Sequence, residues 1–519
     1  VALRTGPDGC LYIVDWYNKI ISHNEVPRNH PDRDKKRGRI WRVKHAEVEP
    51  ATVPDFMKLS GELLLAKLGG PSLPQSHMAW QAISDRQMKE LAPKLKKLSA
   101  DKKQSPARRI ASLWALEGLH AVDVATLKPL LTDANRNLRR EAVRAHRDNG
   151  LSITESLAAL GPLVDDADPE VRAEVIRTVG TMLRQNLESG KISASSSVAM
   201  TAVGLVAKSA RAPLAGPTMK STSKDQTIKV GEAYEREFER YVARLEMEKI
   251  PAVVANYLDT EAARLLPVEN RLVATLALAP QASASRVAHL LPQLGRAPER
   301  DEILRLAQFL DEPGVRDTLS AALQNPASRR HILDSLLQVR TKLDAAKIAP
   351  LLPSATRELL AGNPPAVTLG IQIVSGFQLA ELEGDVTGIL RRNWAEATEN
   401  AKRGDGKIVL SPQAEAVLRA LREMRGGEVE LFAQIAKSTA PDASRNEALA
   451  ALAASNNEQG ATLLLSLWPD LNVSQRRTTL ERLVGNKAGA QAVLAALKSG
   501  NIAKADIHGP AFDKMQTVL

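Results

Sequence analysis

The residues of this sequence whose side chains could do chemistry are few, and the clearest group is Asp15, His23 and Arg39. An imidazole can exchange a proton near neutral pH, and a carboxylate and a guanidinium can hold polar or charged groups. The same side chains are also habitual local hydrogen-bonders. Asp15 could therefore cap the turn that follows it, and His23 could bond to a backbone carbonyl. The sequence leaves both interpretations open.

The sequence predicts no metal site and no covalent catalytic centre. The spacing of His23 and His30 matches no metal-site pattern, and no HExxH, GxSxG or glycine-rich phosphate loop occurs. The single cysteine, Cys10, excludes an intramolecular disulfide, a cysteine-based zinc site and a CxxCH haem attachment, and we expect it to serve packing. We interpret the many carboxylates as satisfied surface residues, together with the remaining histidines, His45, His77, His120, His146, His289, His331 and His508.

Composition favours helices over a large β-structure. The chain has 519 residues, of which 44% are apolar and only 3% aromatic, so a core must be built from small and aliphatic side chains. That length exceeds one ordinary core and indicates several domains or a repeat array. No apolar run approaches the roughly 18–20 residues of a membrane span. Most of the net charge of +10 lies in residues 1–110, where 21 Lys and Arg face 12 Asp and Glu.

The first 45 residues carry β signals. Gly6-Pro7-Asp8-Gly9 is typical of a turn, because proline presets φ and glycine accepts a positive φ. Residues 10–15 and 38–43 have the β-branched and aromatic composition of strands. Two strands cannot bury a core alone, so they need neighbours.

A repeat dominates the remainder. Residues 130–144 recur 33 positions later as residues 163–177, in a pattern that resembles HEAT repeats. Asp168 should cap a helix whose first turn holds Pro169, and Arg172 should pair with the adjacent unit, giving a ladder between repeats. Weaker copies occur at residues 311–316, 325–330, 441–445 and 472–477. The fold class is therefore mainly α, a HEAT-like α-solenoid preceded by a short β remnant; the alternative is an irregular helical bundle.

Hydrophobic spacing predicts several details of the helices. In residues 106–120, Ile110, Leu113 and Trp114 should face the core, while Arg108, Arg109 and Ser112 should fall mostly to the other side. Residues 186–232 lack a sustained period and predict a loop or linker. A helix should begin near Glu232, with Tyr234, Phe238 and Tyr241 on a core-facing stripe. We expect helical repeats over 46–185 and 233–519, and a separate β segment over 1–45.

Residues 6–18 through His23, and residues 37–43, resemble the closing blade of a sugar-dehydrogenase-type β-propeller. The chain as a whole is similar to bacterial membrane-bound dehydrogenase-type proteins, also called PVC-type haem-binding CxxCH proteins. Residues 234–241 resemble a segment of that family's helical region. The family's order is a propeller, a HEAT array and a cytochrome c module. Most of the propeller and the CxxCH motif are absent here, so we expect a fragment lacking both.

The resemblance carries functional expectations. In such propellers, loops gather His, Asp and Arg around a quinone or sugar, where His23 could take a proton from an alcohol, with Asp15 and Arg39 nearby. Haem c, and possible quinone binding, would belong to the missing parts, leaving no cofactor in this chain. We expect a non-catalytic scaffold of a periplasmic or cell-surface sugar or alcohol oxidoreductase. Its partners would be other proteins, or the parent protein's own propeller and cytochrome modules.

The alternative is a free-standing HEAT-repeat binding protein. Such a protein could contact nucleic acid through the basic N-terminal third, especially residues 86–109, where lysines and arginines could meet phosphates. Base stacking would need aromatic residues that residues 89–109 lack, so we expect a solvated helix face there instead.

Overall fold

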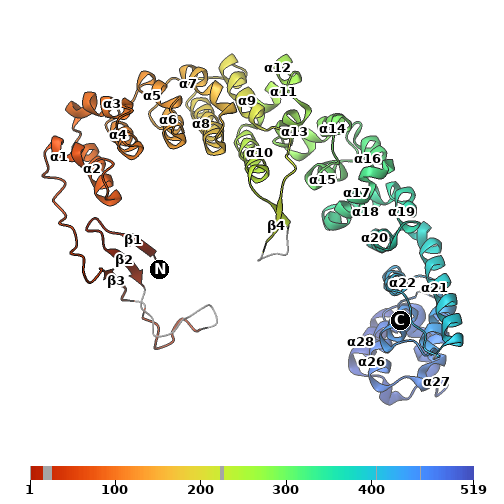
Figure 1. Ribbon diagram of the computed structural model, residues 1–519. Coiled ribbons are helices and arrows are strands. Elements are labelled where there is room, and N and C mark those ends of the chain that lie inside the picture. Colours follow the sequence, from red (N-terminus) through yellow and green to blue (C-terminus); the bar gives the residue numbers. More distant parts are fainter. Residues whose placement is uncertain (1, 16–25, 35, 222–226, 405, 456) are drawn as a thin grey trace. The chain divides into compact units, whose positions relative to one another are not determined.

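The computed structural model describes the chain except for residues 1, 16–25, 35, 222–226, 405 and 456, and it divides into two compact units, Val1–Ala279 and Pro280–Leu519. The prediction of a mainly α, HEAT-like solenoid preceded by a short β segment is confirmed (Figure 1). In the first unit the helices are α1 Gly61–Lys67, α2 Leu73–Asp85, α3 Ala92–Ala100, α4 Pro106–Gly118, α5 Val124–Leu131, α6 Arg136–Asp148, α7 Ile153–Leu160, α8 Pro169–Glu188, α9 Ser197–Ser209, α10 Glu232–Glu248, α11 Pro251–Leu258, α12 Glu261–Arg264 and α13 Val268–Leu276.

The helices of the second unit continue the numbering. They are α14 Pro280–Leu290, α15 Arg300–Gln308, α16 Val315–Gln324, α17 Pro326–Val339, α18 Ala345–Ile348, α19 Pro353–Leu360, α20 Pro364–Gly376, α21 Glu383–Arg403, α22 Pro412–Met424, α23 Val429–Lys437, α24 Asp442–Ala454, α25 Glu458–Ser466, α26 Val473–Leu483, α27 Lys487–Lys498 and α28 Gly509–Val518.

An antiparallel sheet occupies the N-terminal residues. Its strands are β1 Ala2–Thr5, β2 Leu11–Asp15 and β3 Arg39–Val43, in the order β1-β2-β3. The two strands predicted from the sequence correspond to β2 and β3, and β1 was not anticipated. The turn between β1 and β2 has Gly9 at a φ of +82°, which explains the glycine after Pro7-Asp8. A second hairpin joins β4 Thr218–Lys220 to β5 Thr227–Lys229.

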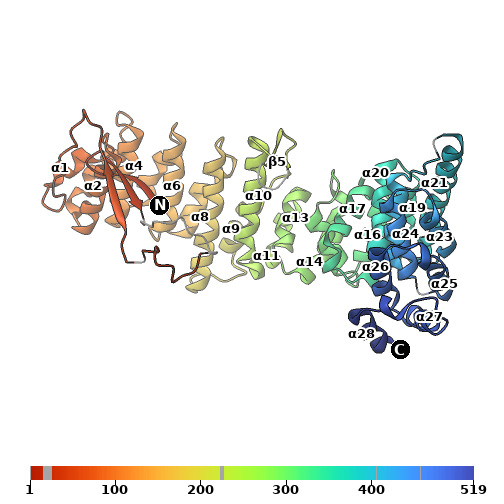
Figure 2. The ribbon, with the colours of Figure 1, turned by 90° about the horizontal axis from the view of Figure 1, so that it is seen from below.

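Helices of the first unit stack in two layers, as repeats of helix pairs require. One layer contains α2, α4, α6, α8 and α10, each packed on the next, and Figure 2 shows α4, α6, α8 and α10 side by side. The other layer contains α3, α5, α7, α9 and α11. Leucine, valine and alanine fill the space between the layers, including Leu113, Leu138 and Val175, all at most 1% exposed. Neither layer could bury its apolar face alone.

Equivalent positions in successive repeats hold the predicted helix caps and the arginines of the predicted ladder. Asp168 accepts hydrogen bonds from the backbone N–H groups of Glu170 and Val171, with Pro169 in the first turn of α8. Four residues after each of three N-caps stands a buried or nearly buried arginine that pairs with a carboxylate of the following repeat. The N–O distances are 2.8 Å for Arg109–Asp133, 2.8 Å for Arg139–Asp166 and 2.6 Å for Arg172–Glu239. The predicted ladder between repeats is confirmed.

Three local predictions were wrong. The segment 186–232 is not a loop throughout, because α9 forms within it and buries Ala199, Val203 and Val206. Its stripe is built largely of alanine, which gives a weak hydrophobic signal. In α4, Arg109 and Ser112 are buried, because the arginine neutralises its charge on Asp133 and the serine hydroxyl donates to the Arg108 carbonyl.

The prediction of a core-facing aromatic stripe on α10 holds for Phe238, which is partly buried against the core, and is wrong for the two tyrosines. Tyr234 and Tyr241 are 50% and 61% exposed, whereas Glu239 and Val242 are buried. Arg172 of α8 reaches Glu239 and fixes which side of α10 packs. The buried side of α10 thus combines this ion pair with the apolar Val242, Ala243 and Met247.

Candidate functional site

The structure brings two of the three sequence candidates together. Asp15 and Arg39 are register partners at the end of β2 and β3, and Asp15 accepts a hydrogen bond from Trp41 Nε1 at 3.2 Å. The guanidinium of Arg39 lies 5.5 Å from the centroid of the Trp41 ring. His23 lies outside the described residues. The contacts of Asp15 and Arg39 are those of an exposed strand end, and their part in catalysis stays a prediction.

Asp8, which the sequence reasoning treated only as a turn residue, organises the sheet. Its carboxylate accepts from the Cys10 backbone N–H at 3.1 Å, from the Tyr12 hydroxyl at 3.0 Å and from Arg42 Nε at 2.8 Å. Burial alone would raise the pKa of Asp8, but these hydrogen bonds lower it to about 2. Cys10 is 4% exposed beside it, consistent with packing. The Pro-Asp-Gly turn was the one sequence signal for this cluster.

A row of charged side chains runs along α4, α6 and α8 of the first unit. We call it the carboxylate ladder, and it comprises Glu117, Glu141, Glu174, Arg144, Arg147 and Arg177. Glutamates stand six residues, and arginines nine residues, after the N-caps Asn135 and Asp168. One repeat therefore presents its charges directly beside the next.

Arg144 lies at the centre of the carboxylate ladder. Its guanidinium contacts Glu117 at 2.6 Å, Glu141 at 2.9 Å and Asp148 at 2.7 Å. Trp114 Nε1 also donates to Glu141, at 3.0 Å. Glu174 receives Arg147 from the preceding helix, at 3.4 Å, and Arg177 from its own helix, at 3.6 Å. These contacts tie three repeats together through side chains.

Burial perturbs the titration of the ladder. It raises the pKa of Glu117 and of Glu174 above the ordinary value, although the neighbouring arginines oppose the rise. Burial would also raise the pKa of Glu141, but hydrogen bonds from Trp114 and Arg144 lower it overall. The prediction that these carboxylates are surface residues was wrong for Glu141 and Glu174, which are 8% and 9% exposed. They are buried because arginines lie within reach.

Aromatic rings lie at both ends of the ladder. His77, Trp80 and Trp114 form an edge-to-face cluster with ring centroids 5.7–6.3 Å apart. At the other end, Arg177 lies 5.5 Å from the Phe238 ring, next to the exposed Tyr241. Large rings beside arginines are the side chains that protein interfaces favour.

His146 was also predicted to lie at the surface, and this was wrong. It is fully buried in α6, and its Nδ1 lies 3.0 Å from the Ser156 hydroxyl of α7. Burial lowers its pKa to about 4. No ligand chemistry is attached to it. Its isolation in the sequence suggested a surface position, but the facing α7 covers it.

Within the described part of the chain, no group of three or more His, Cys, Asp and Glu side chains is placed to hold a metal ion. No helix among the described residues is both long enough and apolar enough to cross a membrane.

Comparison with known proteins adds one sequence match and several structural ones. A family model described as a domain of unknown function, DUF7133, matches residues 1–47. No curated protein matches the chain. A crystal structure of Kap121p has 10% identity and a TM-score of 0.43, over 88% of this chain and 53% of that chain. Importin beta, crystallised in a polyethylene glycol condition, has 12% identity and a TM-score of 0.37, over 83% of this chain and 64% of that chain.

The chain therefore spans less than two thirds of the length of either structure. Scores below 0.5 say nothing about what this chain binds. The geometry of the chain itself is that of an array of helical repeats, with rows of charged and aromatic side chains along the helices.

Proposed function

We propose that this chain is the non-catalytic solenoid and interaction region of a larger dehydrogenase-like protein. The observation that carries the proposal is the unfinished sheet. One face of β1–β3 carries Leu3, Leu11, Trp41 and Val43, which are 55%, 38%, 48% and 49% exposed. A three-stranded sheet with an apolar face needs a covering layer, and propeller blades cover one another in this way.

The helical repeats would serve as the spacer and binding surface of that protein. Ion pairs between successive helices of the first unit resist bending at the repeat junctions, and the aromatic ends of the carboxylate ladder offer anchors for a partner. The partners would be proteins, or the parent's own propeller and cytochrome modules. The periplasm or the cell surface is the compartment that the resemblance implies.

Haem c and a quinone, which the resemblance also implies, would bind in other modules. The one cysteine of this chain is buried in the sheet, and covalent haem attachment through CxxCH needs two cysteines. The residues present do not fit a haem site, and no redox step is assigned to them.

The contacts made by the basic residues 86–109 do not favour the nucleic-acid alternative. Several of these cations are engaged within the protein: Lys94 with Glu62, Lys96 with Asp123 and Arg109 with Asp133. Cations that already neutralise carboxylates release fewer counterions from a phosphate backbone.

Amide hydrogen exchange on β1–β3 tests the proposal. In the isolated chain these amides should exchange rapidly, because one sheet face is uncovered. In the product of the complete reading frame they should be protected, and that frame should encode further sheet-forming segments before residue 1 and a CxxCH motif after residue 519. Equal exchange rates in both proteins, or a reading frame without these segments, would contradict the proposal.

A further inference from the structure

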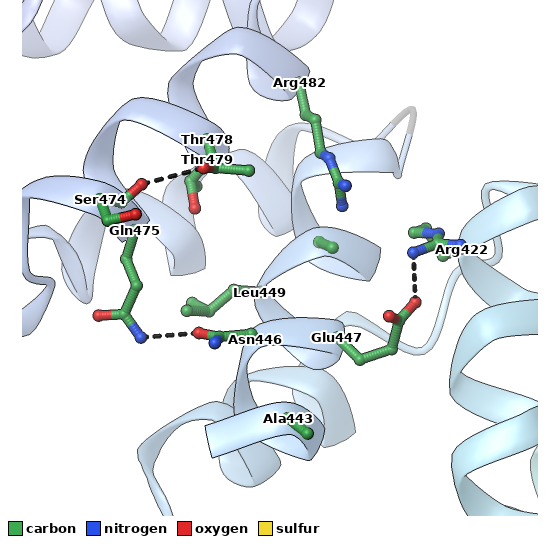
Figure 3. Close-up of a pocket in the computed structure, with 11 residues that line it drawn as sticks. Arg422, Ala443, Asn446, Glu447, Leu449, Ser474, Gln475, Thr478, Thr479 and Arg482 are labelled. Atoms are coloured by element: carbon green, nitrogen blue, oxygen red, sulfur yellow. Dashed lines mark hydrogen bonds and ion pairs between the residues drawn. The ribbon is translucent and has the colours of Figure 1, made fainter.

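We propose that a small polar pocket in the second unit binds a single carboxylate group, carried by an acidic side chain of a polypeptide or by a free small acid. The pocket has a volume of about 230 Å³ and lies between α22, α24 and α26 (Figure 3). The pocket depends on neither the dehydrogenase-like context nor the uncovered sheet. The pocket is defined by Arg422, Asn446, Glu447, Ala450, Gln475 and Arg482.

The pocket lies at a position where α6 and α8 of the first unit carry an arginine and α24 does not. Glu447 stands six residues after the N-cap of α24, the position of Glu141 and Glu174 in the first unit. Nine residues after the cap, where α6 and α8 have Arg144 and Arg177, α24 has Ala450. A methyl group leaves open the space that a guanidinium stem fills elsewhere.

The charges around this space leave one positive charge uncompensated. Glu447 receives Arg422 from the preceding helix at 2.7 Å, much as Glu174 receives Arg147. Arg482 extends from α26 toward the same space, as Figure 3 shows. Among the residues that the structure describes, its guanidinium has no hydrogen-bond or ion-pair partner.

Among the residues that line the pocket, two guanidinium groups stand against one carboxylate, a net charge of +1 that suits a monoanion better than a phosphate dianion. A second carboxylate, Glu423, lies 3.9 Å from Arg422 but outside the lining. A planar guanidinium can grip a carboxylate through two parallel hydrogen bonds. The carboxylate of Glu447 in the wall would repel a second negative charge on the ligand. A carboxyl group is therefore the ligand chemistry that the pocket matches.

The opposite wall supplies neutral donors. Gln475 Nε2 donates to Asn446 Oδ1 at 2.7 Å, and the Asn472 backbone N–H donates to Gln475 Oε1 at 3.1 Å. Because Asn446 accepts through its oxygen, its amide nitrogen remains a donor for a ligand. A water occupies roughly 30 Å³ in the liquid, so the pocket has room for a carboxyl group and a short aliphatic stem.

Ligand-detected NMR on the full chain tests the proposal with four probes: N-acetyl-glutamate N-methylamide, the corresponding blocked glutamine, propionate and inorganic phosphate. The blocked glutamate should bind with a Kd on the order of 1 mM, and the blocked glutamine should not. A preference for blocked glutamate over propionate would identify a polypeptide side chain as the source. Equal binding of the two acids would identify a free small acid.

Variants locate the binding. Arg482→Gln should weaken binding of the blocked glutamate about tenfold, because it removes a charged, bidentate donor. Arg477→Gln is the matched control: Arg477 lies on the same helix, its side chain is 70% exposed, and it pairs with Glu481 at 3.6 Å. That change should alter binding by less than about twofold. Ala450→Leu should abolish binding by filling the pocket.

Several results would overturn the proposal. They are the lack of saturable binding of either acid up to about 50 mM, tighter binding of phosphate than of both acids, and equal weakening by Arg482→Gln and Arg477→Gln. If Ala450→Leu lowers the helical content, Arg482→Gln still decides, because that side chain is exposed and has no partner to lose among the described residues.

Discussion

The two units use the same helix-pair repeat but complete it differently. In α6 and α8 of the first unit, a glutamate six residues after the N-cap is matched by an arginine nine residues after it, and the charges form a continuous ladder. In α24 of the second unit, a glutamate stands at the first of these positions and Ala450 at the second. A pocket lies beside Ala450, where the arginine would be. The comparison of α6 and α8 with α24 therefore turns on one position, nine residues after the cap, where arginine or alanine stands.

The arginines four residues after the caps have carboxylate partners that differ in burial between the units. Arg172 and Glu239 are both buried, with side-chain exposures of 8% and 2%, whereas Arg329 reaches a largely exposed Glu358 at 3.6 Å. Arg172→Ala should lower the unfolding free energy of the first unit by up to about 3–5 kcal/mol, since it leaves the buried Glu239 with only Arg236, 3.8 Å away, as an ion-pair partner. Denaturant unfolding measures the loss.

Arg329→Ala is the control in the second unit. Arg329 also donates to two carbonyls, of Leu323 and Gln324, as Arg172 does to those of Asp166 and Ala167. Its loss should cost less than that of Arg172 because the exposed Glu358 stays hydrated when it is unpaired. The double variant Arg172→Ala with Glu239→Gln should recover part of the loss. Similar losses for Arg172→Ala and Arg329→Ala would show that burial does not distinguish the two units.

A buried histidine makes the first unit sensitive to acid. The pKa of His146 is about 4 in the folded chain against 6.5 when exposed, so the unfolded chain binds the proton more readily. The contribution of neutral His146 to the unfolding free energy is fully present above pH 6.5. It is lost as the pH falls toward 4, and the loss is at most about 3 kcal/mol. Urea unfolding at several pH values should show this loss.

His146→Gln should remove that part of the pH dependence. His331→Gln, which changes an exposed histidine of α17 in the second unit, should leave the profile as it is. An unchanged acid limb in His146→Gln would show that other groups cause it.

The N-terminal cap distinguishes α8 of the first unit from α24 of the second by a smaller amount of free energy. Asp168 caps α8 with two hydrogen bonds, whereas α24 has no side-chain cap at Pro441. Asp168→Ala should cost about 1 kcal/mol in thermal or chemical unfolding, and Asp168→Asn, which keeps the cap, should cost less. Equal losses would assign the effect to the ion pair between Asp168 and Arg136, 3.0 Å apart, and not to the cap.

Restoring the missing arginine gives the smallest expected change. Ala450→Arg places a cation three residues after Glu447, as Arg144 follows Glu141. The gain in stability should be about 0.3–0.5 kcal/mol, measured against Ala450→Gln as a control of similar length without charge. A loss relative to Ala450→Gln would show that α24 cannot accommodate the ladder of the first unit.

The repeat itself was accessible from the sequence because it rests on local rules. The 33-residue offset, the cap at Asp168 and the arginine at position 172 depend on residues close together in the chain. The candidate site was much less accessible. Glu141 and His146 look like surface residues on α6, and only the helices packed against them show that they are buried.

Local sequence thus determined the helix pairs, their caps and the β segment, because each depends on backbone preferences and hydrophobic spacing within a few residues. Tertiary structure alone decided which side of α10 is buried and that Asp8 forms an ion pair with Arg42. It also decided that Ala450 and Arg482 line the same pocket. These outcomes depend on charges brought together from distant positions. The energy of a buried ion pair or an unfilled space exists only after the elements that form it have packed.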